Sequence, residues 1–88
     1  MKKISIVIPV YNAEKFIRNT LISIFNQTYS NFELIITDDG STDDSLNIIK
    51  SFTDNRIRIY SDGENKGISY RLNQQVNLAK GKYFVRMD

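Results

Sequence analysis

The sequence contains no cysteine and no histidine among its 88 residues. Disulfide bonds and thiolate metal sites are therefore excluded, and the composition fits a reducing compartment. The absence of histidine removes the commonest general base near neutral pH and the commonest transition-metal ligand. Any catalysis must rest on carboxylates, hydroxyls, amides or cations, and any bound metal would be a hard ion held by oxygen.

Charge of one sign and long apolar runs are also scarce. The net charge is +2 and the two signs are interspersed, which argues against a nucleic-acid partner or a membrane-binding tail. The apolar run at 4–10 contains Ser5 and Pro9 and no small-residue cleavage site follows it, so we expect a buried strand and not a signal peptide. No stretch approaches the ~20 apolar residues that span a bilayer. The sequence predicts a cytoplasmic protein, with peripheral attachment to the cytoplasmic membrane left open for a full-length form.

The apolar pattern predicts strands and helices in alternation. Runs of β-branched residues predict buried strands at 4–8 and 32–37, strict alternation predicts an edge or half-exposed strand at 56–60, and a fourth strand opens at 83. Apolar residues at helical spacing predict helices at 13–27, around 46–52 and at 68–79. The order β-α-β-α-β-α-β implies right-handed βαβ units. We therefore expect an α/β fold, a Rossmann-like three-layer α/β/α domain with a mainly parallel sheet.

Single residues predict how these elements begin, end and pack. Pro9 should end the first strand because it cannot donate to a ladder, and Asn12 should cap the first helix. Ser41, followed by Asp44 three residues later, resembles a capping box for the second helix. The third helix should bury its apolar residues, which are Ile68, Leu72, Val76 and Ala79.

Polar clusters follow three of the expected strands, at 9–12, 38–41 and 86–88. In open α/β sheets, ligands bind outside the carboxyl ends of the strands. We therefore expect the three clusters to lie on one rim of the sheet and to form the binding site.

Asp38 and Asp39 are the strongest chemical signal in these clusters. Adjacent side chains at a strand end point in opposite directions, so one acid would face the cleft and accept a hydrogen bond from a ligand N–H. The other would cap the following turn or the amides of the loop. The alternative is that both acids only initiate the loop, as Asx-turn residues.

Tyr11 and Arg71 each allow two interpretations. Tyr11 could lie against a planar base, or it could pack on the loop that follows the second strand. Arg71 could bring its guanidinium to a base carbonyl or a phosphate, or it could be a solvated surface side chain. The residues alone leave both questions open.

Other site classes fit the sequence less well. The segment after the first strand has no glycine, which excludes a dinucleotide fingerprint or a P-loop there. The alternative class is a non-catalytic α/β module, such as a phospho-receiver-like signalling domain. A receiver requires its acidic pair after the first strand and a further aspartate after the third. Here the pair follows the second strand and the third ends in Tyr60-Ser61-Asp62, which disfavours that alternative.

Taken in order, four strings resemble the inverting family 2 glycosyltransferases of the GT-A fold. Together they cover the whole chain. They are 6–12 (IVIPVYN), 21–29 (LISIFNQTY), 33–43 (ELIITDDGSTD), and a pattern that begins at Asn65-Lys66-Gly67 and continues with Arg71, Asn73, Ala79, Gly81 and Tyr83.

This resemblance implies a pocket for a nucleotide base. Pro9 and Tyr11 would lie against the base, Asp39 would accept its ring N–H, and Arg71 would donate to a base carbonyl. Glu14 stands where the family often has an acidic residue near the nucleotide. The base in most such enzymes is uracil, so the resemblance implies a UDP-linked sugar as the donor.

The resemblance also implies that parts of the enzyme lie beyond this chain. Arg86-Met87-Asp88 looks like the start of the family's Asp-x-Asp motif, with Asp88 as its first, nucleotide- and metal-binding acid. We expect residues 1–88 to be the N-terminal nucleotide-sugar-binding portion, truncated at that motif and inactive alone. The catalytic residues and a divalent cation, Mg²⁺ or Mn²⁺, would belong to the full-length enzyme.

The implied full-length enzyme would transfer the sugar, with inversion, to a hydroxyl of a glycan or a lipid-linked acceptor. This reaction would serve polysaccharide or cell-surface glycan synthesis. For the fragment itself, an unpaired last strand predicts a homodimer formed through the exposed sheet edge.

Overall fold

The computed structural model describes residues 3–79, 81 and 83–86, and its element order is the predicted one. The strands are β1 (Ile4–Val10), β2 (Phe32–Asp38), β3 (Ile57–Ser61) and β4 (Tyr83–Arg86). The helices are α1 (Ile17–Phe25), α2 (Ser45–Lys50) and α3 (Ile68–Leu78). The polar cluster at 86–88 falls largely outside the described residues, and so does Asp88.

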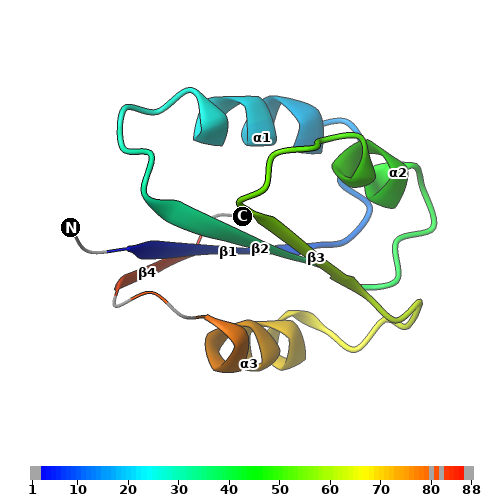
Figure 1. The fold of residues 1–88 in the computed structure, drawn as a ribbon. Coiled ribbons are helices and arrows are strands. Elements are labelled where there is room, and N and C mark those ends of the chain that lie inside the picture. The colour runs from blue at the N-terminus through cyan, green and yellow to red at the C-terminus, as the bar shows by residue number, and fades with distance from the viewer. Residues whose placement is uncertain (1–2, 80, 82, 87–88) are drawn as a thin grey trace.

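The four strands form one parallel sheet in the order β3-β2-β1-β4. Helices α1 and α2 cover one face of this sheet and α3 covers the other (Figure 1). The predicted three-layer α/β/α architecture is therefore confirmed, and β3 lies at an edge as its alternating pattern predicted. In the described part of the chain β4 pairs only with β1. The homodimer through this edge stays a prediction.

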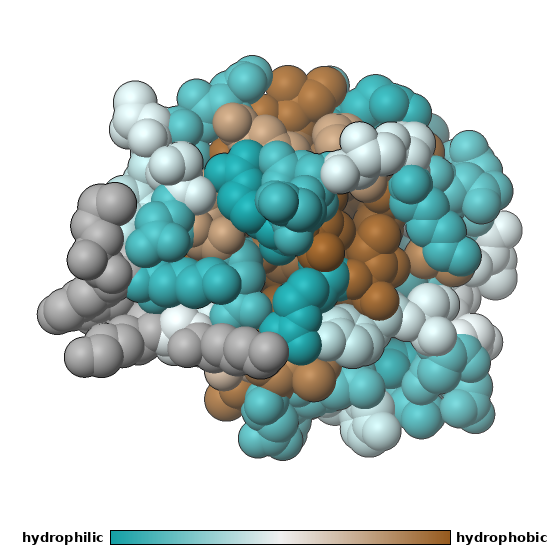
Figure 2. Space-filling view, viewed as in Figure 1, coloured by the Kyte–Doolittle hydropathy of each residue, from teal (hydrophilic) through white to brown (hydrophobic). Residues whose placement is uncertain are grey.

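The apolar core lies between the sheet and the α1–α2 layer. It consists of inward-facing residues from both layers, namely Ile6, Ile8, Val10, Ile17, Leu21, Ile24, Phe32, Leu34, Ile36 and Ile49. Apolar surface also reaches solvent between the two helical layers (Figure 2). On the edge strand β3, Ile57 and Ile59 are half-buried. An edge strand leaves such residues partly uncovered.

The prediction that Pro9 ends the first strand is wrong, because β1 continues to Val10 and Pro9 pairs with Thr37. The Val10 carbonyl accepts the Asp39 N–H on the β2 side. Because successive residues alternate, the nitrogen of Pro9 faces the opposite side of β1. Among the described residues, pairing on that side ends at Val7 with Arg86. Proline is tolerated at such an edge position because no ladder hydrogen bond is lost.

The first helix begins at Ile17 and not at 13, and Asn12 does not cap it. Asn12 adopts a positive φ of 49°. Its Oδ1 accepts the Thr42 N–H at 2.8 Å, in a loop thirty residues away in sequence. The side chain expected to cap a helix therefore ties two loops together.

The predicted capping box of the second helix is also wrong. Helix α2 begins at Ser45, and no side chain caps it at Asp44. The Ser41 hydroxyl accepts the Asn12 N–H at 2.9 Å, and Asp43 Oδ1 accepts the Ser45 N–H at 2.9 Å. Ser41 is thus used in a bond between the two loops, and the Ser45 N–H at the start of α2 is bound by Asp43.

The buried face of α3 is polar, contrary to the prediction from its apolar residues. Arg71 and Gln75 are the buried residues of this helix, whereas Ile68 and Val76 are each 50% exposed. Gln75 Nε2 donates to the Ile35 carbonyl of β2, and Arg71 donates to Asp39. The helix is oriented by these polar contacts and not by its apolar stripe.

A second polar cluster joins α3 to the other end of the sheet. Glu33 is buried and accepts hydrogen bonds from the Ser5 hydroxyl at 2.6 Å and from Arg58 at 3.0 Å. Arg58 also donates to the Leu78 carbonyl at the end of α3. The face of the sheet that meets α3 is thus polar at both ends. None of the helices in the described part of the chain is long and apolar enough to cross a membrane.

Leu21→Ala tests the position of the core. Leu21 is fully buried against the sheet, so we expect its truncation to lower the free energy of unfolding by about 2–5 kcal/mol. Ile22→Ala is the matched control, because the neighbouring Ile22 is 44% exposed. It should change stability by about 0.5 kcal/mol or less. Urea unfolding followed by circular dichroism measures both, and equal losses would contradict the assigned face of α1.

Candidate functional site

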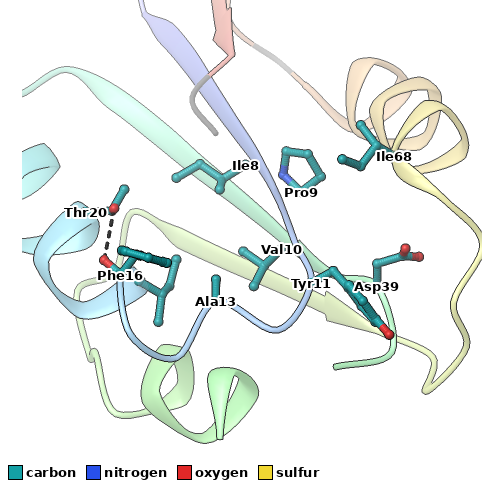
Figure 3. Close-up of a pocket in the computed structure, with 10 residues that line it drawn as sticks. Ile8, Pro9, Val10, Tyr11, Ala13, Phe16, Thr20, Asp39 and Ile68 are labelled. Carbon is teal, nitrogen blue, oxygen red and sulfur yellow. Dashed lines mark hydrogen bonds between the residues drawn. The ribbon is translucent and has the colours of Figure 1, made fainter. Parts of the chain in front are cut away.

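A cavity of about 350 Å³ opens at the carboxyl end of β1. It lies between the end of β1, the segment that leads into α1 and the first residue of α3 (Figure 3). Its walls are mostly apolar and consist of Ile8, Pro9, Val10, Tyr11, Ala13, Phe16, Ile17, Thr20, Asp39 and Ile68. Asp39 supplies the only carboxylate among these lining residues.

Three of the predicted site residues, Pro9, Tyr11 and Asp39, meet at this cavity. Tyr11 and Asp39 lie near one another at one end, and Phe16 and Thr20 line the other end (Figure 3). Tyr11 is 47% exposed. Both interpretations of its ring, against a planar base or on the loop after β2, stay predictions.

The Asp39 carboxylate is buried and binds three donors. Oδ1 accepts the Lys66 N–H at 2.8 Å and Arg71 Nε at 2.8 Å, while Oδ2 accepts the Gly67 N–H at 3.1 Å. Burial by itself would raise the pKa of Asp39. These hydrogen bonds and the charge of Arg71 outweigh it and lower the pKa below its ordinary value. The wall of the cavity therefore carries a fixed negative charge.

Arg71 is the partner that compensates this charge. Its Nε–H donates to Asp39. Its two terminal nitrogens donate to both carboxylate oxygens of Asp62, to the Glu64 carbonyl and to the Gln74 side chain. These contacts use its five N–H donors. The hydrogen bonds to Asp62 do most to raise the pKa of Arg71, and burial opposes them.

Arg71 is only 1% exposed, so the alternative of a solvated surface arginine is wrong. In this structure its N–H groups are bound to protein acceptors. A contact with a base carbonyl would require it to exchange one of them. That role of Arg71 stays a prediction.

Asp38 points to the other side of the sheet, as strand alternation predicted. Its Oδ2 accepts the Ser41 N–H at 3.1 Å, which is the expected turn-initiating role. Its buried Oδ1 has no hydrogen-bond partner among the described residues. The interpretation that both acids serve only the turn holds for Asp38 and is wrong for Asp39.

Glu14 and Asp88 are not brought to the cavity by the described structure. The Glu14 side chain is exposed and is not among the lining residues. Its backbone N–H donates to Asp43 Oδ2 at 3.2 Å, which adds to the tie between the two loops. Asp88 lies outside the described residues. The roles of both side chains stay predictions.

The sequence matches a known family over nearly its whole length. Residues 5–88 fit the pattern described as Glycosyl transferase family 2. The chain belongs to this family. The predicted resemblance is thereby confirmed.

Relatives and solved structures agree with family 2 membership. Glycosyltransferase GlyA of Streptococcus pneumoniae serotype 4 is 43% identical over 98% of this chain. UDP-Glc:alpha-D-GlcNAc-diphosphoundecaprenol beta-1,3-glucosyltransferase WfaP of Escherichia coli is 40% identical over all of it. The crystal structure of S. aureus TarS in complex with UDP-GlcNAc matches 98% of the chain with a TM-score of 0.89 and 30% identity. The predicted GT-A architecture is thereby confirmed.

The chain is much shorter than the proteins it resembles. It spans 12% of GlyA, 35% of WfaP and 26% of the TarS chain. The comparisons therefore concern only a part of each of these proteins.

The described residues do not fit a divalent metal ion. They contain no group of three acidic, histidine or cysteine side chains that could hold one. The Asp39 carboxylate is bound to a guanidinium and two amides, which occupy positions that a hard cation would need.

Two residues of the site were missed by sequence reasoning. Asp62 follows β3 directly and was considered only for the receiver alternative, although the rule about carboxyl ends applies to every strand. Gly40 has a positive φ of 72°, and a Cβ there would lie 2.7 Å from the Glu64 backbone. In the sequence, the feature that could have indicated Gly40 is a glycine directly after two acids, because glycine allows a close approach of two chain segments.

Gly40→Ala tests the contact between Gly40 and the 62–67 loop. Gly63→Ala is the matched control, because Gly63 has a similar φ of 76° but a methyl group added there would meet nothing within 4 Å. We expect the control to lose about 1–2 kcal/mol from backbone strain alone. Gly40→Ala should lose about 1–3 kcal/mol more, because the added carbon meets rigid backbone. Chemical denaturation measures both, and equal losses would show that the loop does not lie against Gly40.

The pH dependence of stability tests the bound carboxylates. Arg56 holds the pKa of Asp54 at about 2, and the pKa values of Asp39 and Asp62 are also lowered. A lowered folded-state pKa adds stability above the unfolded value of 3.8, and this stability is lost as pH falls through the folded pKa. The free energy of unfolding should therefore fall between about pH 5 and pH 2. Asp54→Asn should flatten the lower part of that curve, and an unchanged curve would contradict the Asp54–Arg56 pair.

Proposed function

We propose that this chain is the nucleotide-binding part of a glycosyltransferase that uses a UDP-linked sugar. The observation that carries this proposal is the Asp39 carboxylate, held ionised at the wall of an apolar cavity beside Tyr11. A uracil ring presents a ring N–H donor and an apolar face. A single fixed acceptor and an aromatic side chain are the complementary groups.

The geometry of Asp39 suits one further donor. Among the described groups, Oδ1 receives two hydrogen bonds and Oδ2 receives one. A carboxylate oxygen accepts about two hydrogen bonds, so Oδ2 retains one acceptor position. A ring N–H bound there would make a charge-assisted hydrogen bond, which is about twice as strong as a neutral one.

The apolar walls contribute the second part of recognition. Pro9 and Tyr11 lie on one continuous segment at the end of β1, and Ile68 approaches from α3. A planar base buried between such side chains gains apolar contact and loses water around Asp39. The hydrogen bond to the ionised carboxylate is stronger in that drier environment.

The activity of the whole protein is the larger part of the proposal. It would transfer the sugar with inversion to a hydroxyl of a glycan or lipid-linked acceptor, in polysaccharide or cell-surface glycan synthesis. Support comes from relatives such as WfaP, whose name states a UDP-Glc donor and a diphosphoundecaprenol-linked acceptor. Mg²⁺ or Mn²⁺, the metal acid Asp88, a catalytic carboxylate beyond this chain and a cytoplasmic location belong to this proposal.

Asp39→Asn tests the proposed recognition of the base. The variant removes the charge that binds both the ring N–H and Arg71, so we expect UDP affinity to fall about tenfold or more. Asp38→Asn is the matched control, since the neighbouring Asp38 points away from Arg71 and binds Ser41. Its UDP affinity should stay within about twofold of the unsubstituted chain.

NMR titration of the ¹⁵N-labelled chain with UDP measures these affinities even when binding is weak. Circular dichroism of each variant checks that the fold is kept. The proposal fails if UDP produces no saturable shifts in the unsubstituted chain. It also fails if Asp38→Asn and Asp39→Asn, both folded, bind UDP equally well.

A further inference from the structure

Asp62 binds the two terminal nitrogens of Arg71, whereas Asp39 binds its Nε. Its Oδ1 lies 2.7 Å from Arg71 Nη2 and its Oδ2 lies 3.2 Å from Nη1, so the carboxylate holds both terminal nitrogens. Asp62 Oδ1 also accepts the Glu64 N–H at 3.0 Å. A two-point contact between planar groups fixes the orientation of the guanidinium as well as its position.

The guanidinium of Arg71 therefore lies between two acids that come from different strands. Asp39 comes from the end of β2 and is buried, whereas Asp62 follows the end of β3 and its side chain is 36% exposed. The Arg71 Nε–H is directed at Asp39 because its terminal nitrogens are held by Asp62 and by the Glu64 carbonyl. A rotation of the guanidinium would move the hydrogen bond that positions Asp39.

We propose that Asp62 is a positioning residue that sets the base selectivity of this site by acting through Arg71 on Asp39. This inference rests on the proposed function and adds a residue to it. Held by Asp62, Arg71 keeps its Nε–H on Asp39 Oδ1, and the carboxylate stays in place to accept a hydrogen bond from a base. Such a site selects a base whose ring nitrogen carries a hydrogen.

Uracil and cytosine differ in this respect at the same ring position. Uracil presents an N–H there, whereas cytosine presents a lone pair that an ionised carboxylate repels. A site built around one hydrogen bond rejects the analogue that cannot make it, because its own polar group is left without a partner. Asp62 maintains this rejection by keeping Arg71 on Asp39, so that the carboxylate stays ionised and in position.

Asp62→Asn tests the inference through the ratio of UDP to CDP affinity. Asparagine has one acceptor oxygen and no charge, so an Arg71 N–H is released and Asp39 is held less firmly. We expect the preference for UDP over CDP to fall about fivefold or more, the size expected for coupled residues in one network. Asp62→Glu, which restores the charge, should recover most of the preference.

The matched control is Asp54→Asn. Asp54 also binds an arginine through both oxygens, with Arg56 as its partner, but it lies before β3 and not after it. Its removal should lower stability and leave the UDP to CDP ratio within about twofold of the starting value. A purely structural role of Asp62 would give this same result.

Both ratios are measured by NMR titration of the ¹⁵N-labelled chain, with the Arg71 Nε–H signal as a direct report on its bond to Asp39. A shift of this signal in Asp62→Asn, together with a reduced ratio, supports the inference. An unchanged ratio in a folded Asp62→Asn overturns it, whether or not the signal moves. If the variant is partly unfolded, the titration is repeated with an osmolyte that restores the folded population. Failure of the unsubstituted chain to bind UDP would instead overturn the proposed function.

Discussion

The ion pair between Asp39 and Arg71 organises the carboxyl end of the sheet. A buried carboxylate is costly unless it is paired and hydrogen-bonded, and here one guanidinium and two loop amides share that task. Helix α3 must present Arg71 to the sheet, and the 62–67 loop must pass over Gly40 to bring its amides to Asp39. The position of α3, the path of the 62–67 loop and the polar end of the cavity therefore all depend on the contact between Asp39 and Arg71.

The two faces of the sheet are held by different kinds of interaction. The face that meets α1 and α2 is a continuous apolar core, while the face that meets α3 is polar at both ends. Apolar contacts are non-directional, whereas hydrogen-bonded ion pairs fix orientation. This division explains why the anionic group of the site comes from the α3 face. A carboxylate that is already held by protein donors needs little rearrangement to receive a ligand donor.

Much of the fold could be predicted from the sequence because strand patterns are local. The β-branched runs of β1 and β2 and the alternation of β3 indicated their places in the sheet, and strand alternation separated the directions of Asp38 and Asp39. The helix ends could not be predicted in the same way. Asn12 looks like a cap, but its partner Thr42 is thirty residues away and belongs to another loop. Asp62 follows β3 at the carboxyl rim of the sheet, but only the folded structure shows that it binds Arg71.

The sequence by itself determined the α/β architecture, the family, and the presence of Pro9, Tyr11 and Asp39 at one rim. These follow from short-range patterns and from motifs read in order. Only the tertiary structure decided that α3 buries Arg71 and Gln75 and leaves Ile68 and Val76 half-exposed. Helical periodicity ranks side chains by hydropathy alone, whereas the buried Asp39 carboxylate makes an arginine the more favourable residue to bury. That preference exists only after β2, β3 and α3 have come together, and so it is absent from any one segment of the chain.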